Sequence, residues 1–500
     1  MSFHSRLAFP CKRPLVSLAL SALFALPACG DDGGDGTGPD AGGNADAGAT
    51  LVPETYTFES RFAPGESSVA YSGQVMRQVL IGEMKNYIGR LTQEIDTQQT
   101  VPSVGETTAA LEFYYRFDAG TSGQVPLTIT TDPPLMQMVY DDISSSNLAG
   151  KLAGNDLMGQ HADWTMNFVG WDPNDATTPE GLLLHWFDQL DTLAVERSQG
   201  TIPTDPDGVA LTAVYLTPEG LDLQQLIQKF LLGALAYSQG TDDYLDNDLP
   251  DHGINVSNLQ AEGNPYSALE HHWDEGYGYF GAARDYNLYT DDEIAGADGR
   301  EGWSNGYHDT DDSGSIDLMS EYNFGNSQNA AKRDRGSAES APTDYSAQVM
   351  DAFLTGRAII AGADGELDTD AMAELVAQRD LIVDGWERAI AATVVHYIND
   401  TLRDMNTFGT QDYDFADHAK HWSELKGFAL GLQFNPRSQV SAVDFAMFHD
   451  LVGDAPALPN DDANDISTYR ANLISARAIL AASYDFDPAN IGDDNGENGW

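Results

Sequence analysis

Basic residues are scarce in this sequence of 500 residues. It has 25 Lys and Arg against 78 Asp and Glu, which gives a formal net charge of -53. A chain this acidic repels phosphate backbones, so nucleic acid is excluded as a partner. The hydrophobic fraction is still 42%, which is enough for a buried core and excludes wholesale disorder.

Cysteine is scarce as well, because the chain contains only Cys11 and Cys29. Residues 1–28 carry basic side chains followed by a short apolar stretch, a pattern typical of an export signal that is removed. Leu26-Pro27-Ala28-Cys29 resembles a bacterial lipobox, so we expect Cys29 to be lipidated and to become the mature N-terminus. Disulfides, thiolate metal sites and a cysteine nucleophile are then excluded.

Long apolar runs are missing after the signal. Residues 29–54 are mostly Gly, Asp and Ala, and we expect them to form a flexible stalk. No later segment is apolar for the roughly 18 residues that a membrane span needs. The lipid on Cys29 is thus the expected membrane anchor, and it places the protein at the cell envelope, on the outer membrane or the cell surface of a bacterium.

Hydrophobic residues from residue 55 onward recur mainly at helical spacing. Tyr71–Leu91 is an amphipathic example, with Ser72 as its expected N-cap. Segments 127–131 and 209–216 are compatible with short strands but lack evident partners. Further helices are expected over residues 179–197, 218–244, 266–283, 345–361, 369–405, 415–432 and 466–484. The sequence therefore predicts an all-α fold.

Two motifs occur twice, in the same order along the chain. Residues 71–82 recur as 345–356, and His272–Glu275 recurs as His421–Glu424. This order favours an internal duplication that produced two related helical bundles with long loop insertions.

The expected bundles cover residues 55–290 and 341–490, and residues 291–340 form an acidic, calcium-binding linker between them. The linker contains oxygen donors at the spacing of an EF-hand calcium loop, with Gly314 at the sixth position, where such loops turn sharply. Ser320 replaces the usual Glu at the twelfth position, so Glu321 is expected to substitute at lower affinity. The predicted ligands are Asp309, Asp311, Ser313, the carbonyl of Ser315, Asp317 and Glu321. The alternative is an acidic turn without an ion.

The repeated His-x-x-Glu turns are candidates for a second metal site. A His and a Glu at i and i+3 share one helical face, where they can bind one metal or each other. If the two turns face each other, His272, Glu275, His421 and Glu424 would hold a transition metal such as iron or zinc. The alternative is that each pair stays within its own bundle.

Five segments together resemble an uncharacterised family of bacterial lipoproteins, a domain of unknown function related to the imelysin-like proteins. They are residues 71–74, 225–236, 273–281, 320–334 and 421–427. The resemblance implies a pair of four-helix bundles and a role in iron uptake. Imelysin-like proteins were once classed as metallopeptidases because of a Gly-x-His-x-x-Glu motif. His421 and Glu424 match this motif, but Ala419 replaces its Gly, which weakens the case for a peptidase.

The sequence therefore predicts a lipid-anchored, calcium-stabilised binding protein of the cell envelope that captures a metal ion or an iron-bearing ligand, and it leaves open whether the protein is an enzyme. Two alternatives stay open. One is a metal-dependent hydrolase that uses His421 and Glu424, and the other is a purely structural surface protein.

Overall fold

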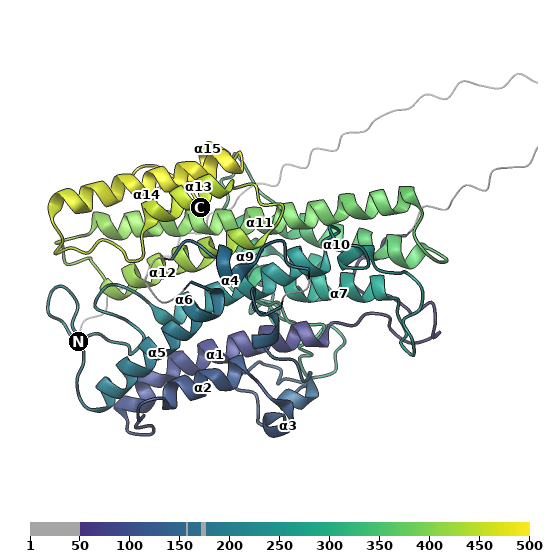
Figure 1. Cartoon of the computed structure of the whole chain (residues 1–500), viewed down its shortest axis with the longest axis horizontal. Helices are drawn as coiled ribbons and strands as arrows, with labels where there is room; N and C mark the ends of the chain where they lie inside the picture. Colours follow the sequence, from purple (N-terminus) through teal and green to yellow (C-terminus); the bar gives the residue numbers. More distant parts are fainter. Residues whose placement is uncertain (1–50, 157–158, 172–176) are drawn as a thin grey trace, which may run out of the picture. The chain divides into compact units, whose positions relative to one another are not determined.

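Helices form the regular structure of the computed structural model, which describes residues 51–156, 159–171 and 177–500 (Figure 1). The predicted signal peptide, Cys29 and most of the stalk lie outside these residues. Within them, isolated β-bridges take the place of sheets, so the prediction of an all-α fold is confirmed. No helix in the described ranges combines the length and the apolar character that crossing a membrane requires.

The α-helices are α1 (Ser72–Asp96), α2 (Glu106–Tyr115), α3 (Ala119–Ser122), α4 (Trp164–Asn167), α5 (Pro179–Ser198), α6 (Leu223–Leu231), α7 (Ala268–Phe280), α8 (Asp291–Ile294), α9 (Gly325–Gly336), α10 (Tyr345–Gly362), α11 (Thr369–Asn406), α12 (Phe415–Gly431), α13 (Ala442–Val452), α14 (Ala463–Ser483) and α15 (Pro488–Ile491). Short 3-10 turns are η1 (Tyr140–Asp142), η2 (Ala149–Lys151), η5 (Gly253–Asn255), η6 (Tyr286–Leu288) and η7 (Leu432–Phe434).

The helix predicted over residues 218–244 changes its hydrogen-bonding pattern along its length. It begins as α6 and continues into two π-helical segments, η3 (Leu232–Tyr237) and η4 (Gly240–Tyr244). Glycines let this stretch pack closely, because a Cβ atom on Gly233 would lie 2.6 Å from the Cα atom of Gly431 in α12. The backbones of η3 and α12 therefore touch, which only residues without a side chain permit.

The helices pack in a series in which each contacts the next. α14 packs on α13 and α11, α11 on α12, α12 on α6, and α6 on α1, which also contacts α2 and α5. Figure 1 shows this order from the yellow helices through the green α11 to the purple α1. α6 and α12 belong to different predicted bundles, so helices from both halves share contacts. The domain boundaries at residues 291 and 341 stay a prediction.

One hydrophobic core extends through both halves of the described chain. Its largest members are four fully buried tryptophans, Trp186, Trp273, Trp386 and Trp422. The stretch predicted as a linker also contributes to the core, since Ala330 and Ala331 of α9 are fully buried. The α9 part of the predicted linker is thus packed in the same core as the predicted bundles.

A buried ion network joins α7 to α10. Arg357 of α10 is fully buried and pairs with Glu270 at 3.0 Å and with Asp274 at 2.9 Å, both in α7. Its remaining donor reaches the hydroxyl of Ser68 at 2.7 Å, and the Tyr56 hydroxyl donates to Asp274 at 2.8 Å. Because each charged group has partners, the network avoids the desolvation penalty of an isolated buried charge.

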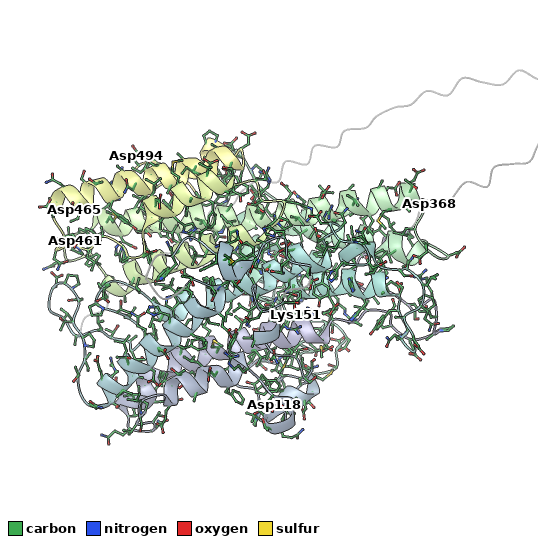
Figure 2. The ribbon with its side chains drawn as sticks, viewed as in Figure 1. Asp118, Lys151, Asp368, Asp461, Asp465 and Asp494 are labelled. Atoms are coloured by element: carbon green, nitrogen blue, oxygen red, sulfur yellow. The ribbon has the colours of Figure 1, made fainter. Side chains whose placement is uncertain are left out.

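Part of the acidic composition is explained by the helix starts. Eight helices begin after an aspartate whose carboxylate accepts a hydrogen bond from a backbone N–H in the first turn, and Asp is among the strongest N-cap residues. These caps are Asp118, Asp163, Asp222, Asp344, Asp368, Asp414, Asp462 and Asp487. Figure 2 shows Asp368 at the start of α11 and Asp465 within the first turn of α14.

The repeated segments 71–82 and 345–356 both form helix starts, in α1 and α10. The helix predicted over Tyr71–Leu91 is confirmed and continues to Asp96. The prediction that Ser72 is its N-cap is wrong, because the helix begins at Ser72 and Tyr71 takes the cap position without a side-chain hydrogen bond. The common origin of the two halves stays a prediction.

Candidate metal centre

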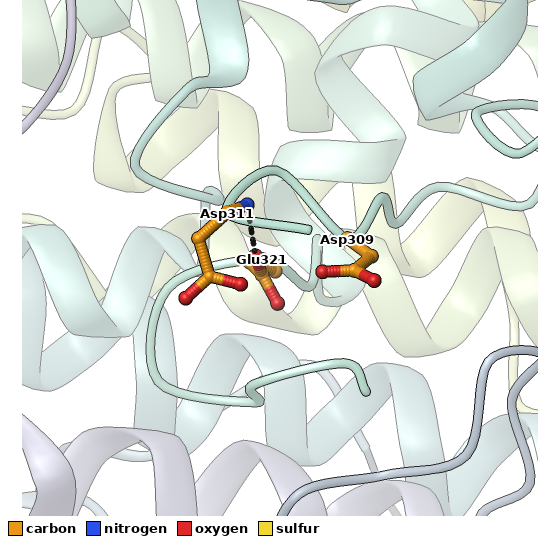
Figure 3. Close-up of side chains that lie close together, drawn as sticks. All are labelled: Asp309, Asp311 and Glu321. Atoms are coloured by element: carbon orange, nitrogen blue, oxygen red, sulfur yellow. Dashed lines mark hydrogen bonds between the residues drawn. The ribbon is translucent and has the colours of Figure 1, made fainter. Parts of the chain in front are cut away.

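Three carboxylates of the predicted calcium loop lie close together between α8 and α9. One oxygen from each of Asp309, Asp311 and Glu321 lies within 4.8 Å of the other two (Figure 3). Calcium binds oxygen at about 2.3–2.6 Å, so two of its ligands lie no more than about 5 Å apart. A single calcium ion fits between these three side chains.

Asp309 closes the turn of this loop. Its carboxylate accepts hydrogen bonds from the backbone N–H groups of Ser313 and Gly314, both at 2.8 Å. Gly314 has a φ of 82°, in the left-handed region that favours glycine. The sharp turn predicted at the sixth position is therefore present.

Glu321 is buried and is held from three directions. One carboxylate oxygen accepts from the backbone N–H groups of Thr310 at 2.7 Å and Asp311 at 3.3 Å, and the other accepts from Asp317 at 2.8 Å. Burial raises the pKa of Glu321, and these three N–H groups oppose that shift. Oε1 already accepts two of these bonds, whereas Oε2 accepts one, so Oε2 keeps a lone pair that can ligate a cation.

The remaining predicted ligands have other partners in the structure. The Asp317 carboxylate accepts from the side chain of Gln137 and from the hydroxyl of Ser320, each at 2.7 Å, and is not part of the group of three carboxylates. The Ser313 hydroxyl donates to the Ser315 carbonyl at 3.0 Å. Ser320, at the twelfth position, thus orients Asp317.

The loop also connects segments that are distant in the sequence. Ile316 is fully buried, and its backbone N–H donates to the carbonyl of Pro134 at 2.9 Å, while its carbonyl accepts from Met136 at 2.8 Å. The Thr310 hydroxyl donates to Asp285 at 2.7 Å. A cation that fixes the loop would therefore also fix its contacts with residues 134–137 and 285.

The first His-x-x-Glu turn lies in α7, and its two side chains have separate partners. His272 shares a hydrogen bond with the carbonyl of Gly253 at 2.9 Å, and burial lowers the pKa of its imidazole to about 4. Glu275 accepts from Gln74 at 2.8 Å, and its other oxygen lies 3.7 Å from His271.

The second His-x-x-Glu turn lies in α12, and its two side chains also have separate partners. The His421 imidazole lies 2.8 Å from Asp404 of α11, whereas Glu424 pairs with Lys229 of α6 at 3.2 Å. Among the described residues, the only group of three or more potential metal ligands is the loop triad. His272, Glu275, His421 and Glu424 therefore do not converge on one metal position in this structure.

Glu424 is surrounded by cations instead of other metal ligands. Burial alone would raise its pKa, but Lys229 and Lys420 hold the pKa below its usual value. The charge of Glu424 also acts on three further basic groups. We call the five basic residues around it the basic cluster: Lys85, Lys229, Lys332, Arg333 and Lys420. Such surroundings repel a divalent metal.

Sequence reasoning missed the basic cluster. The chain has only seven lysines, and four of them belong to this cluster. A signal was present at Lys229, because an apolar run follows it in the sequence and a solvated charge is unusual there. What the sequence did not contain was the packing of α1, α6, α9 and α12 that brings these positions together.

The comparisons with known proteins give one match. A family described as a domain of unknown function (DUF4856) matches residues 176–293, less than half of the chain. This stretch is similar to that family. Neither the comparison with curated proteins nor that with solved structures gives a match.

The match confirms the resemblance to an uncharacterised domain family. The matched residues contain α5, α6, both π-helical segments and α7, and so include Lys229, His272 and Glu275. The calcium loop and His421–Glu424 lie beyond the matched range. The lipoprotein status and the relationship to imelysin-like proteins stay predictions.

Proposed function

We propose that this chain is a calcium-stabilised binding protein, held at the bacterial cell envelope by a lipid on Cys29. The observation that carries the calcium part is the triad of Asp309, Asp311 and Glu321, whose oxygens lie within 4.8 Å of one another. Three carboxylates this close repel one another unless a cation neutralises them. The loop spacing and the turn at Gly314 support calcium as that cation.

The calcium site is tested by thermal unfolding of Asp309→Asn in calcium and in chelator. A ligand that binds only the folded state adds about 2.7 kcal/mol at a hundredfold excess over Kd. The wild-type protein should therefore melt at a higher temperature in calcium, and Asp309→Asn should lose most of this gain because a carboxylate ligand is gone.

Asp312→Asn is the matched control. Asp312 lies in the same loop, is exposed and stands outside the triad, so the variant removes the same charge without removing a predicted ligand. Its φ of 56° is also one that Asn tolerates well. Equal losses in the two variants, or identical melting of the wild-type protein in calcium and chelator, would reject the proposal.

The anchor is tested by Cys29→Ser. The thiol is the only group at the lipobox junction that can be acylated, so the variant should lose lipid attachment and appear in the soluble fraction. Metabolic lipid labelling with fractionation checks this. A labelled, membrane-bound Ser variant would show that the anchor lies elsewhere.

The resemblance to imelysin-like proteins supports a metal ion or an iron-bearing small molecule as the captured ligand. The surroundings of Glu424 do not favour the alternative of a metal-dependent hydrolase. Hydrolysis of that kind needs an open metal position beside a general base, and the nearest charged group to Glu424 is the ammonium of Lys229 at 3.2 Å.

A further inference from the structure

The basic cluster is unusual because the chain as a whole has a net charge of -53. Two carboxylates, Glu424 and Asp222, act on Lys85, together with the positive charges of Lys229 and Lys332. Asp222 is buried and already caps α6 by accepting from Gln225 at 3.0 Å. Five basic side chains thus face fewer acidic ones, which leaves a local excess of positive charge.

The lysines show the effect of this excess. Burial, and then the neighbouring Lys229 and Lys332, lower the pKa of Lys85 to about 7. Burial and Lys229 lower the pKa of Lys332 to about 8, although part of its side chain is exposed to solvent.

A polar recess of about 300 Å³ lies beside the cluster. Lys85 lines it, and its ammonium has no hydrogen-bond or ion-pair partner among the described residues. The neighbouring walls offer further hydrogen-bonding groups, from Asn86, Thr128, Thr130, Gln228 and Gln328. Lys229 donates to Gln228 at 2.9 Å, which connects the buried part of the cluster to the wall.

Two further groups have unused donors, namely Arg333 of the basic cluster and the start of α9, which lies at the recess. Arg333 is 7% exposed, and its Nε and Nη1 atoms have no hydrogen-bond partner. The 12-residue helix α9 begins at Gly325, which lines the recess, and no side chain caps its first turn. The N–H groups of a helix start favour a negative charge.

We propose that the basic cluster and the recess beside it bind a small oxyanion of the sulfate or phosphate type. The recess is polar, its wall presents an unpartnered ammonium, and the surrounding charges attract an anion and repel a metal ion. The recess is large enough for such an ion with part of its hydration shell. None of the three carboxylates of the calcium loop lines this recess.

The test is titration of the purified protein with sulfate, at constant ionic strength and with calcium present throughout. Lys85→Gln should weaken sulfate binding about tenfold or more, because a hydrogen bond to a charged group contributes about 1.5–3 kcal/mol. Arg116→Gln is the control, since it removes one positive charge from the exposed end of α2, outside the cluster. Absence of sulfate binding, or equal weakening in both variants, would overturn the proposal.

Glu424→Gln removes a negative charge from the cluster, so its effect on sulfate affinity should be opposite to that of Lys85→Gln. Glu424 competes with an added anion for Lys229 and Lys420, so its neutralisation should strengthen sulfate binding in a variant that circular dichroism shows to be folded. Weaker binding in such a folded variant would contradict the proposal.

The pH profile gives a further check, because sulfate keeps its charge over this range. An anion prefers the charged form of Lys85, whose pKa of about 7 lies below that of an ordinary lysine. Sulfate affinity should therefore rise as the pH falls from about 8.5 to about 6. The charged groups that act on Lys85 are Lys229, Glu424, Lys332 and Asp222. A profile that is flat in the wild-type protein, or unchanged in Lys85→Gln, would contradict the assignment to Lys85.

Discussion

His272 is a neutral, largely buried imidazole at the centre of α7. It makes its hydrogen bond with the carbonyl of Gly253, and its ring packs edge-on against Tyr244 with ring centroids 5.5 Å apart. Burial lowers its folded-state pKa to about 4, below the value of about 6.5 expected in the unfolded chain. The neutral imidazole is therefore the form present in the folded state near neutral pH.

This shift has a consequence for stability. Between about pH 6.5 and pH 4 the unfolded chain binds a proton at His272 that the folded chain does not, so the free energy of unfolding falls as the pH is lowered through this interval. In His272→Asn, which can still donate to Gly253, that part of the loss should disappear. The difference should be on the order of 2 kcal/mol, reduced from the full shift because the ring is not completely buried.

Denaturant unfolding at several pH values measures this difference. His185→Gln is a suitable control, because His185 is exposed on α5. The free energy of unfolding should fall less in His272→Asn than in the wild-type protein or the control as the pH is lowered from 6.5 to 4. If it falls equally in all three proteins, His272 is not buried as described.

At the scale of helices, the two repeated motifs differ in their packing. Gly82 and Gly356 stand at equivalent positions of the repeat, in α1 and α10. A Cβ atom on Gly82 would meet no atom within 4 Å, whereas one on Gly356 would lie 2.0 Å from the ring of Trp273. A side chain at this position of the repeat therefore has room on α1, whereas close packing on α10 requires glycine.

The pair yields a matched prediction. Gly82→Ala should stabilise the protein by up to about 1 kcal/mol, because Ala is the better helix former. Gly356→Ala should destabilise it by about 1–3 kcal/mol, because the buried Trp273 must shift. Thermal or denaturant unfolding of both variants checks the signs. Destabilisation by Gly82→Ala would contradict the open space beside α1, and no destabilisation by Gly356→Ala would contradict the packing of α7 on α10.

Long helices with a regular apolar face could be predicted from the sequence. The prediction for residues 369–405 differs from α11 (Thr369–Asn406) by one residue, since its apolar spacing persists over the whole length. α9 was not predicted, because its buried face includes Asn326, Ser327 and Asn329, which do not look like a core pattern. Polar residues that pack inside a protein can be recognised only when their partners are known.

Only part of the candidate site could likewise be predicted from the sequence. The triad of Asp309, Asp311 and Glu321 could be found from spacing alone, because a calcium loop draws its ligands from one short segment. The relation of His272 to His421, and the gathering of Lys85 with Lys229, depend on tertiary packing, which carries no local signature. The short-range prediction therefore corresponds to a cluster in the structure, and the long-range one does not.

At the scale of the whole molecule, acidic and basic side chains take different places in the fold. Aspartates cap the helix starts, whereas four of the seven lysines lie around Glu424. The calcium loop connects residues 134–137 to residue 285 and leads directly into α9, whose first residue lines the polar recess. Calcium in the loop would thus stabilise contacts between segments about 180 residues apart, measured from residue 135 to residue 316.

Calcium binding by Asp309, Asp311 and Glu321 can be measured by calorimetric titration of the wild-type protein and of Asp311→Asn with calcium. We expect one binding event per wild-type chain that is lost or strongly weakened in Asp311→Asn and retained in Asp312→Asn. Calcium binding of equal strength in all three proteins, or none in the wild-type protein, would contradict it.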